Sequence, residues 1–185
     1  MKTTLKNIAS IQTGVFAKPA LSGDLVYLQA RHFDESGKLT GSLYPDILAD
    51  SISENHILRT GDVLFAAKGT KNFAVAFEDH FPLSVASTSF FVIRLQNEIV
   101  LPQYLAWYLN NPYSQQFLKN FAIGTSIASI SKSVLDGLEI FIPDLKKQEL
   151  ILKITQLRNT EKKLKQEIEI LREKLIQQLI INAIK

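Results

Sequence analysis

A heptad pattern in the C-terminal part of the chain constrains its fold more than any other feature. The spacing between its members alternates between three and four residues, which is the 3.5-residue period of a coiled coil. The members of this seam are Ile154, Leu157, Glu161, Leu164, Ile168, Leu171, Leu175 and Gln178. A single helix of about 40 residues cannot bury such a stripe against itself. The pattern therefore predicts a long helical arm that joins a partner helix.

The residues before this arm have no heptad rhythm, so we expect a globular head over residues 1–143 and the arm over residues 144–185. Hydrophobic residues make up 46% of the chain, which is enough for a packed core. Expected strands and helices follow one another without regular alternation. This order predicts an α+β fold, in which a mixed globular head is followed by a long C-terminal coiled-coil helix.

Glycine, proline and asparagine residues divide the head into short elements. Residues 5–11 form either a helix or a strand, and residues 63–67 and 73–77 have the spacing of a hairpin. Further strands are expected over residues 25–28, 83–94 and 138–142. Helices are expected from Pro102 and from Pro112, because proline favours the first turn of a helix.

The net charge of +3 is unevenly distributed. Residues 1–143 carry 11 basic and 12 acidic side chains, whereas residues 144–185 carry 10 basic and 6 acidic ones. The head is therefore not a uniformly basic nucleic-acid binder, and any contact with DNA must use a local basic face.

The absence of cysteine excludes disulfides, thiolate zinc sites and cysteine nucleophiles. It also fits a reducing cytosol. The N-terminal residues lack the apolar run of a signal peptide, and no segment approaches the ~20 apolar residues of a membrane span. We therefore expect a cytoplasmic protein that does not enter a membrane.

Three fragments resemble catalytic motifs but lack the context that those motifs need. Residues 110–113 are similar to the Asn-Pro-Pro-Tyr motif of adenine methyltransferases, but one proline is missing and no glycine-rich turn accompanies them. Asp144, Glu161 and Lys163 have the spacing of a nuclease metal site, yet the last two fall within the expected arm. Residues 68–70 have the wrong order for a phosphate-binding loop. We expect no catalytic residues, no metal and no cofactor.

An ordered set of short segments resembles the specificity subunit of Type I restriction-modification systems. The set includes Gly-Asp-Val-Leu-Phe at residues 61–65 and Pro-Gln-Tyr-Leu-Ala-Trp-Tyr-Leu-Asn at residues 102–110. It ends with Leu-Glu-Ile-Phe-Ile-Pro at residues 138–143, followed by Leu145, Gln148 and the long helix. The resemblance covers essentially the whole chain.

The resemblance implies a non-catalytic DNA-reading subunit whose helix acts as spacer and docks methyltransferase subunits. The chain has one head and one arm, where the usual subunit has two of each, so it looks like a half-size form. Two copies are then needed to read a bipartite, symmetric DNA site. The expected partners are double-stranded DNA, a second copy of the chain, methyltransferase subunits and, where one is present, a restriction subunit.

Polar side chains in loops between strands are the expected DNA contacts, because base edges and phosphates are recognised by amide, cationic and hydroxyl groups. The candidates, in order of preference, are Lys68, Thr70, Lys71 and Asn72; then Gln29, Arg31 and His32; then Lys18. Residues 87–89 (Ser-Thr-Ser) fit either phosphate contacts or an exposed strand face. The dimerisation residues are the apolar members of the seam.

Two further readings stay open at the level of sequence. The head of a coiled-coil adaptor binds protein instead of DNA, and an enzyme with an unrecognised site is the third hypothesis. Near the end of the arm, Ile176, Ile180, Ile181 and Ile184 form a second apolar stripe. This stripe fits a docking surface for a methyltransferase or for the partner's head, and equally a frayed helix end.

Overall fold

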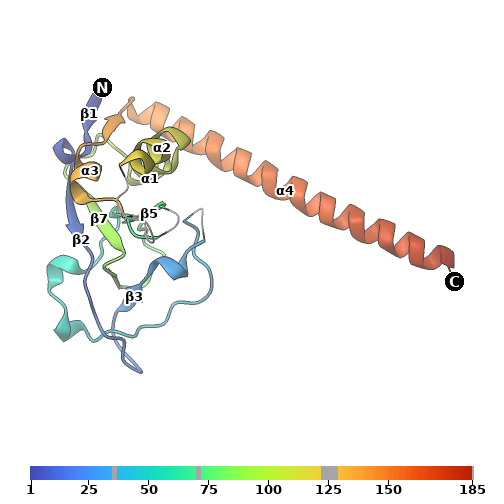
Figure 1. Cartoon of the computed structure of the whole chain (residues 1–185), viewed down its shortest axis with the longest axis horizontal. Coiled ribbons are helices and arrows are strands. Elements are labelled where there is room, and N and C mark those ends of the chain that lie inside the picture. Colours follow the sequence, from blue (N-terminus) through green and yellow to red (C-terminus); the bar gives the residue numbers. More distant parts are fainter. Residues whose placement is uncertain (35–36, 70–71, 122–128, 185) are drawn as a thin grey trace. The chain divides into compact units, whose positions relative to one another are not determined.

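The computed structural model describes residues 1–34, 37–69, 72–121 and 129–184. It divides into two compact units, Met1–Gln148 and Glu149–Lys185. The first unit contains mixed strands and helices, and the second is a continuous helical segment (Figure 1). The prediction of an α+β fold with a long C-terminal helix is confirmed.

The described strands form a four-stranded sheet and two two-stranded ones. Their bounds are β1 (Lys2–Thr4), β2 (Ala9–Thr13), β3 (Val26–Leu28), β4 (Val63–Ala66), β5 (Ala74–Ala76), β6 (Ser84–Ala86), β7 (Phe90–Leu95) and β8 (Glu139–Phe141). The larger sheet has the order β2-β7-β4-β5 and is antiparallel throughout. β1 pairs antiparallel with β8, and β3 pairs parallel with β6. The expected hairpin is the β4–β5 pair.

The helices begin where the sequence supplies proline or a polar cap. Their bounds are α1 (Pro102–Asn110), α2 (Pro112–Asn120), α3 (Lys132–Asp136) and α4 (Leu145–Ile184), together with short 3₁₀ turns at Leu5–Asn7, Ala30–His32, Ala49–Ser51 and Glu54–His56. The Asn111 side chain accepts a hydrogen bond from the Tyr113 N–H and caps α2. The Ser131 hydroxyl accepts one from the Val134 N–H and caps α3. These bonds satisfy donors that a helix start leaves unpaired.

One sequence expectation needs correction, and the two alternatives that sequence allows for another are combined in the structure. Residues 83–94 form β6 and β7, which belong to different sheets, instead of one strand region. The interruption is a turn in which the Phe90 N–H donates to the Ser87 carbonyl over 3.0 Å. Residues 5–11 contain both alternatives, because a 3₁₀ turn at Leu5–Asn7 leads directly into β2.

The hydrophobic core of the first unit holds closely packed aromatic rings. Phe33, Phe73 and Phe90 are mutually in contact, with ring centroids 5.7–6.0 Å apart. Two of these three contacts are edge-on, which is a favoured geometry for aromatic rings. The core therefore holds the ends of β3, β5 and β7, whose loops carry most of the predicted DNA contacts.

Gln148 is a buried polar residue in the first turn of α4. Its side chain is 0% exposed and accepts a hydrogen bond from the Leu101 N–H at the start of α1. Its amide nitrogen donates to the carbonyls of Ile99 and Pro143, at 2.8 and 2.9 Å. All three bonds lie within the first unit, so this turn of α4 is anchored in it.

Candidate nucleic-acid interface

A cavity of about 510 Å³ gathers the polar residues of three segments that are distant in sequence. We call it the hydroxyl pocket. Its lining residues are Phe16, Ala17, Lys18, Pro19, Tyr27, Gln29, Ser87, Thr88 and Ser89. Among these described residues there is a lysine, an amide and several hydroxyls, but no carboxylate. Such a lining favours a ligand that carries negative charge and hydrogen-bond acceptors.

The walls of the hydroxyl pocket are fixed by backbone hydrogen bonds. The Ser87 N–H donates to the Leu28 carbonyl, and the Val15 N–H donates to the Ala86 carbonyl, both over 2.8 Å. Gly14 lies so close to this turn that an added Cβ would be 2.2 Å from the Ser87 carbonyl oxygen. Only glycine allows this approach, which brings the loop after β2 against the turn between β6 and β7.

The hydroxyls of the turn are interlinked. The Oγ atoms of Ser87 and Ser89 are 2.7 Å apart, and Ser87 is largely buried while Thr88 and Ser89 are partly exposed. The strand face that sequence alone allowed for residues 87–89 is therefore absent, because a turn replaces it. Hydroxyl groups are common phosphate contacts, and in this turn those of Thr88 and Ser89 belong to partly exposed residues.

Lys68 comes directly after Ala67, which is hydrogen-bonded to the turn of residues 87–89. The Ala67 N–H donates to the Ser89 carbonyl over 2.9 Å, and the Lys68 side chain is exposed. The Asn72 amide nitrogen donates to the Ala66 carbonyl over 2.8 Å, so one of its two N–H groups holds the hairpin loop. The predicted contacts Thr70 and Lys71 lie outside the described residues.

Gln29, Arg31 and His32 lie at the end of β3 and in the 3₁₀ turn after it. Arg31 is exposed, whereas His32 is half-buried. The His32 Nδ1 accepts a hydrogen bond from the Gln29 N–H over 3.3 Å. Burial, and then the nearby Arg31, lower the pKa of His32, so the imidazole is neutral at pH 7. Arg31 therefore supplies the positive charge of this segment.

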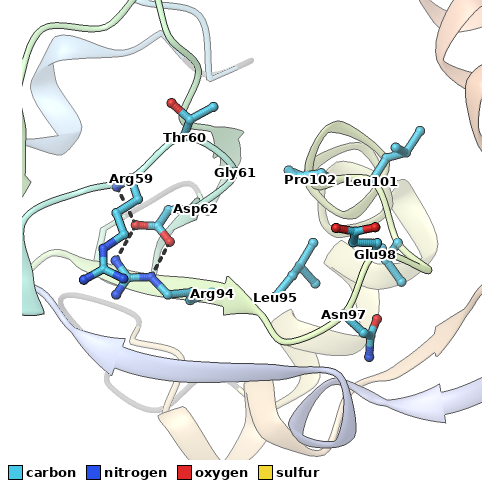
Figure 2. A pocket seen from close by; sticks show the side chains of 11 residues that line it. Arg59, Thr60, Gly61, Asp62, Arg94, Leu95, Asn97, Glu98, Leu101 and Pro102 are labelled. Atoms are coloured by element: carbon cyan, nitrogen blue, oxygen red, sulfur yellow. Dashed lines mark hydrogen bonds and ion pairs between the residues drawn. The ribbon is translucent and has the colours of Figure 1, made fainter.

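A second cavity, of about 310 Å³, lies at the start of β4 and has a different character. Figure 2 shows the Asp62 carboxylate beside Arg59 and Arg94, with Leu101 and Pro102 across the cavity. Asp62 accepts two bonds of 2.7 Å from Arg94, and one of 2.9 Å from the Arg59 N–H. We call this cavity the arginine pocket.

The ion pair between Asp62 and Arg94 in the arginine pocket connects two parts of the fold. Asp62 is 1% exposed, and its hydrogen bonds to Arg94 raise the pKa of that guanidinium. The carboxylates of Asp62 and Glu98 line the pocket, which disfavours a phosphate ligand. We therefore assign this pair a structural role, which is to hold the turn before β4 against β7.

The seam residues of α4 are exposed throughout. Every residue over 156–184 is exposed, and the apolar members of the predicted dimerisation seam are between 48% and 62% exposed. These members are Ile154, Leu157, Leu164, Ile168, Leu171 and Leu175. Leu150, which is 55% exposed, extends the seam by one position toward the N-terminus. Sequence reasoning missed Leu150, although it lies four residues before Ile154.

The described residues contain neither a metal-binding cluster nor a helix that could span a membrane. No cluster of three or more histidine, cysteine or acidic side chains in them has the arrangement of a metal site. None of the helices in the described part of the chain has the length and apolar character to cross a membrane.

Comparison with solved structures shows the same fold. The Type I restriction-modification S subunit from M. genitalium has a TM-score of 0.59 and 16% identity, over 86% of this chain and 39% of that chain. A structure titled for the complex assembly and conformational transition of the type I R-M system has a TM-score of 0.66 and 17% identity, over 90% and 40%. The HsdS subunit from Thermoanaerobacter tengcongensis has a TM-score of 0.57 and 20% identity, over 92% and 46%. The chain thus spans less than half the length of these three proteins.

The family assignment comes from sequence. No curated protein matches the chain. Residues 5–170 match the family model of the Type I restriction modification DNA specificity domain. Because this match includes nearly all of the first unit and more than half of the second, the chain belongs to the Type I restriction modification DNA specificity domain family.

Proposed function

We propose that this chain is a half-size, non-catalytic specificity subunit, which reads DNA through the hydroxyl pocket and pairs with a second copy through α4. The observation that carries the DNA-reading part is the pocket itself, where Lys18, Gln29 and the turn of residues 87–89 converge without a carboxylate among the described lining residues. Lys68 follows Ala67, which bonds to Ser89, and Arg31 lies two residues after Gln29, so these two exposed cations are the proposed phosphate contacts.

The exposed seam supports pairing with a second copy. Seven apolar side chains from Leu150 to Leu175 are each about half exposed or more, and a helix of this kind is stable when a partner covers its stripe. Because solved relatives are more than twice as long, two copies supply a comparable length of chain. The pair then presents two DNA-reading units to a bipartite site.

The seam sequence favours an antiparallel pair with a single register. The layers that face each other are Leu150 with Leu175, Ile154 with Leu171, Leu157 with Ile168, and Glu161 with Leu164 of the second copy. A shift by one heptad in either direction brings Lys147 or Gln178 into a layer. The favoured register therefore buries all seven apolar side chains and leaves one polar residue per arm in the seam.

Glu161 disfavours the parallel alternative. In a parallel pair the two Glu161 carboxylates face each other in the seam, and like charges there repel in a partly desolvated position. In the antiparallel pair Glu161 keeps its own ion pair with Lys165, at 2.6 Å. The flanking charges oppose this preference, since the antiparallel pair brings together like charges (Lys153 with Lys174, Arg158 with Lys165), whereas the parallel pair has one like pair (Lys153 with Arg158) and one opposite pair (Glu167 with Arg172). Exposed pairs, however, contribute less than about 1 kcal/mol each. The seam residue therefore decides the orientation.

The antiparallel register fixes the distance along the helix axis between the two Gln148 residues. The centre of the pair falls between Lys162 and Lys163, so the two Gln148 residues are roughly 44 Å apart along the axis at 1.5 Å per residue. This length is of the same order as the 34–36 Å or so between half-sites one DNA turn apart. The second apolar stripe, Ile176, Ile180, Ile181 and Ile184, does not occupy seam positions and is exposed, so it stays available for the methyltransferase subunits.

Cysteine cross-linking tests the register, because the chain has no cysteine of its own. Glu161→Cys and Leu164→Cys variants are mixed and oxidised. The antiparallel register predicts a disulfide between the two different variants, whereas a parallel pair predicts Glu161→Cys joined to itself. A chain that stays monomeric in sedimentation at high concentration would end the pairing proposal.

DNA binding is tested by its salt dependence. A duplex is first selected by the wild-type chain from a randomised pool, and its affinity is then measured from 50 to 200 mM salt. We expect a loss of orders of magnitude, because phosphate contacts release counterions. Lys18→Ala with Lys68→Ala lowers the affinity and reduces the slope by about two, whereas Lys119→Ala, an exposed lysine on α2, leaves both unchanged. A flat salt response favours the adaptor reading instead.

A further inference from the structure

Phe16 is a large apolar side chain that remains in water at the rim of the hydroxyl pocket. Phe16 is 76% exposed, whereas Phe65 and Phe90 in the neighbouring sheet are at most 1% exposed. A single exposed hydrophobic residue is common on protein surfaces. The exposure of Phe16 therefore has meaning only if its position is fixed and its surroundings fit a ligand.

The backbone on both sides of Phe16 is held by one buried hydroxyl. Tyr27 is 5% exposed, and its phenol group donates to the Val15 carbonyl over 3.0 Å. The same oxygen accepts a hydrogen bond from the Ala17 N–H over 3.4 Å. With the Val15 N–H bonded to Ala86, the two peptide groups that flank Phe16 are tied to the core. The ring is therefore presented to solvent from a fixed backbone.

The surroundings of Phe16 match the chemistry of a nucleotide. Lys18, two residues along the chain, offers a cation for a phosphate, and Gln29 offers an amide for a base edge. The hydroxyls of residues 87–89 complete the lining. An aromatic face beside cationic and hydrogen-bonding groups is the combination with which proteins bind unstacked bases. An apolar ligand does not need these polar groups.

We propose that the Phe16 ring stacks on a DNA base that enters the hydroxyl pocket, so that Phe16 is a base-contacting residue of this chain. The inference rests on the proposed DNA-reading function and names one contact within it. The stacking adds an aromatic contact to the hydrogen bonds with base edges and to the phosphate contacts that are already part of the proposed function. Stacking on the ring requires the DNA to open locally at that step, which makes the contact sensitive to how easily the sequence unstacks.

Substitutions at position 16 separate stacking from simple apolar contact. Phe16→Leu keeps an apolar side chain but removes the aromatic face, whereas Phe16→Trp keeps the face. With the duplex selected by the wild-type chain, we expect Phe16→Leu to weaken binding roughly tenfold to a hundredfold and Phe16→Trp to bind within a few-fold of the wild type. Tyr113→Leu, which removes an aromatic ring of 74% exposure on α2, is the matched control and has no effect.

Two further measurements distinguish a base contact from a structural role. Phe16→Leu should leave the melting temperature of the protein unchanged, because the ring is exposed. It should also leave the slope of affinity against salt unchanged, because no phosphate contact is removed, whereas Lys18→Ala lowers that slope by about one. Equal binding by the wild type and Phe16→Leu overturns this inference alone. Failure of the wild type to select any duplex overturns the proposed function as well.

Discussion

The two units of this chain differ in how far their apolar side chains are exposed to solvent. In the first unit Leu5, Phe65 and Leu105 are 0% exposed, so the residues of its core find their partners within the same 148 residues. In the second unit Leu157 and Leu171 are 61% and 62% exposed. The first unit therefore encodes a complete core, whereas the exposed stripe of the second unit is the half of an interface that we propose a second copy covers. Under this proposal, the stability of the first unit is a property of one chain, and that of the second depends on protein concentration.

The largest effect is expected from charges placed in the seam. Leu164→Asp with Leu171→Asp should raise the dissociation constant of the pair at least about 100-fold, because the carboxylates must leave water when the arms pair. The melting temperature of the first unit should not change. Sedimentation and thermal unfolding measure the two properties separately.

The control for the seam variant carries the same charge on the opposite face of α4. Asn159→Asp with Gln166→Asp adds two carboxylates at positions that point away from the seam. It should pair as the wild type does. If the seam variant unfolded the first unit, the two units would not be independent.

A substitution at Asp62 tests the opposite case, in which the first unit loses stability while the pairing of the arms is unaffected. Asp62→Ala removes the partner of the Arg94 guanidinium and should lower the free energy of unfolding by about 3 kcal/mol, without an effect on pairing. Asp79→Ala, which removes an exposed carboxylate, should change it by less than about 0.5 kcal/mol. Urea denaturation gives both values. A small effect of Asp62→Ala would mean that the ion pair is solvated.

Tyr104 gives the first unit a specific alkaline response. Burial raises the pKa of the Tyr104 phenol from 10.0 to about 12. Because the folded state holds this proton more tightly, its contribution is fully present below pH 10 and is lost as pH rises through 12. The loss amounts to roughly 2–3 kcal/mol. Tyr104→Phe should remove this loss of stability at alkaline pH. The free energy of unfolding is measured against pH for the wild type and for Tyr104→Phe, and the difference between the two curves gives the contribution of the phenol.

The smallest of these effects is expected at Gln148, where the first turn of α4 is anchored. Gln148→Ala leaves two carbonyls and the Leu101 N–H without their partner, which should cost about 2 kcal/mol. Glu149→Ala, at the neighbouring exposed residue, should be nearly neutral. Chemical denaturation compares the two, and equal values would show that water replaces the lost amide.

Sequence predicted those elements whose signals are local. The long helix follows from a 3.5-residue period, and the β4–β5 hairpin from two apolar runs around a glycine-containing loop. The break between β6 and β7 was missed because residues 87–89 contain neither glycine nor proline. The parallel β3–β6 pairing was also missed, since its partners are far apart in the chain and nothing in either strand identifies the other.

The candidate site shows the same difference between local signals, which sequence reveals, and long-range contacts, which it does not. Lys18 and Gln29 were identified separately from their loop positions, but their convergence with residues 87–89 depends on the β3–β6 pairing. Phe16 was not identified, because an aromatic next to Val15 gives no sign of pointing outward. The decisive contact is the Tyr27 hydroxyl, which bonds to residues ten and twelve positions earlier.

The turn between β6 and β7 has a consequence for how such a protein changes over evolutionary time. Ser87 and Phe90 are tied to different sheets, and Thr88 lies between them with its side chain at the hydroxyl pocket. If the hydroxyl pocket reads DNA as we propose, a new residue at position 88 changes the group that meets the DNA, while the backbone hydrogen bonds of Ser87 and Phe90 keep both strand registers. Sequence recognition would then diversify at a position that the pairing of the strands does not depend on.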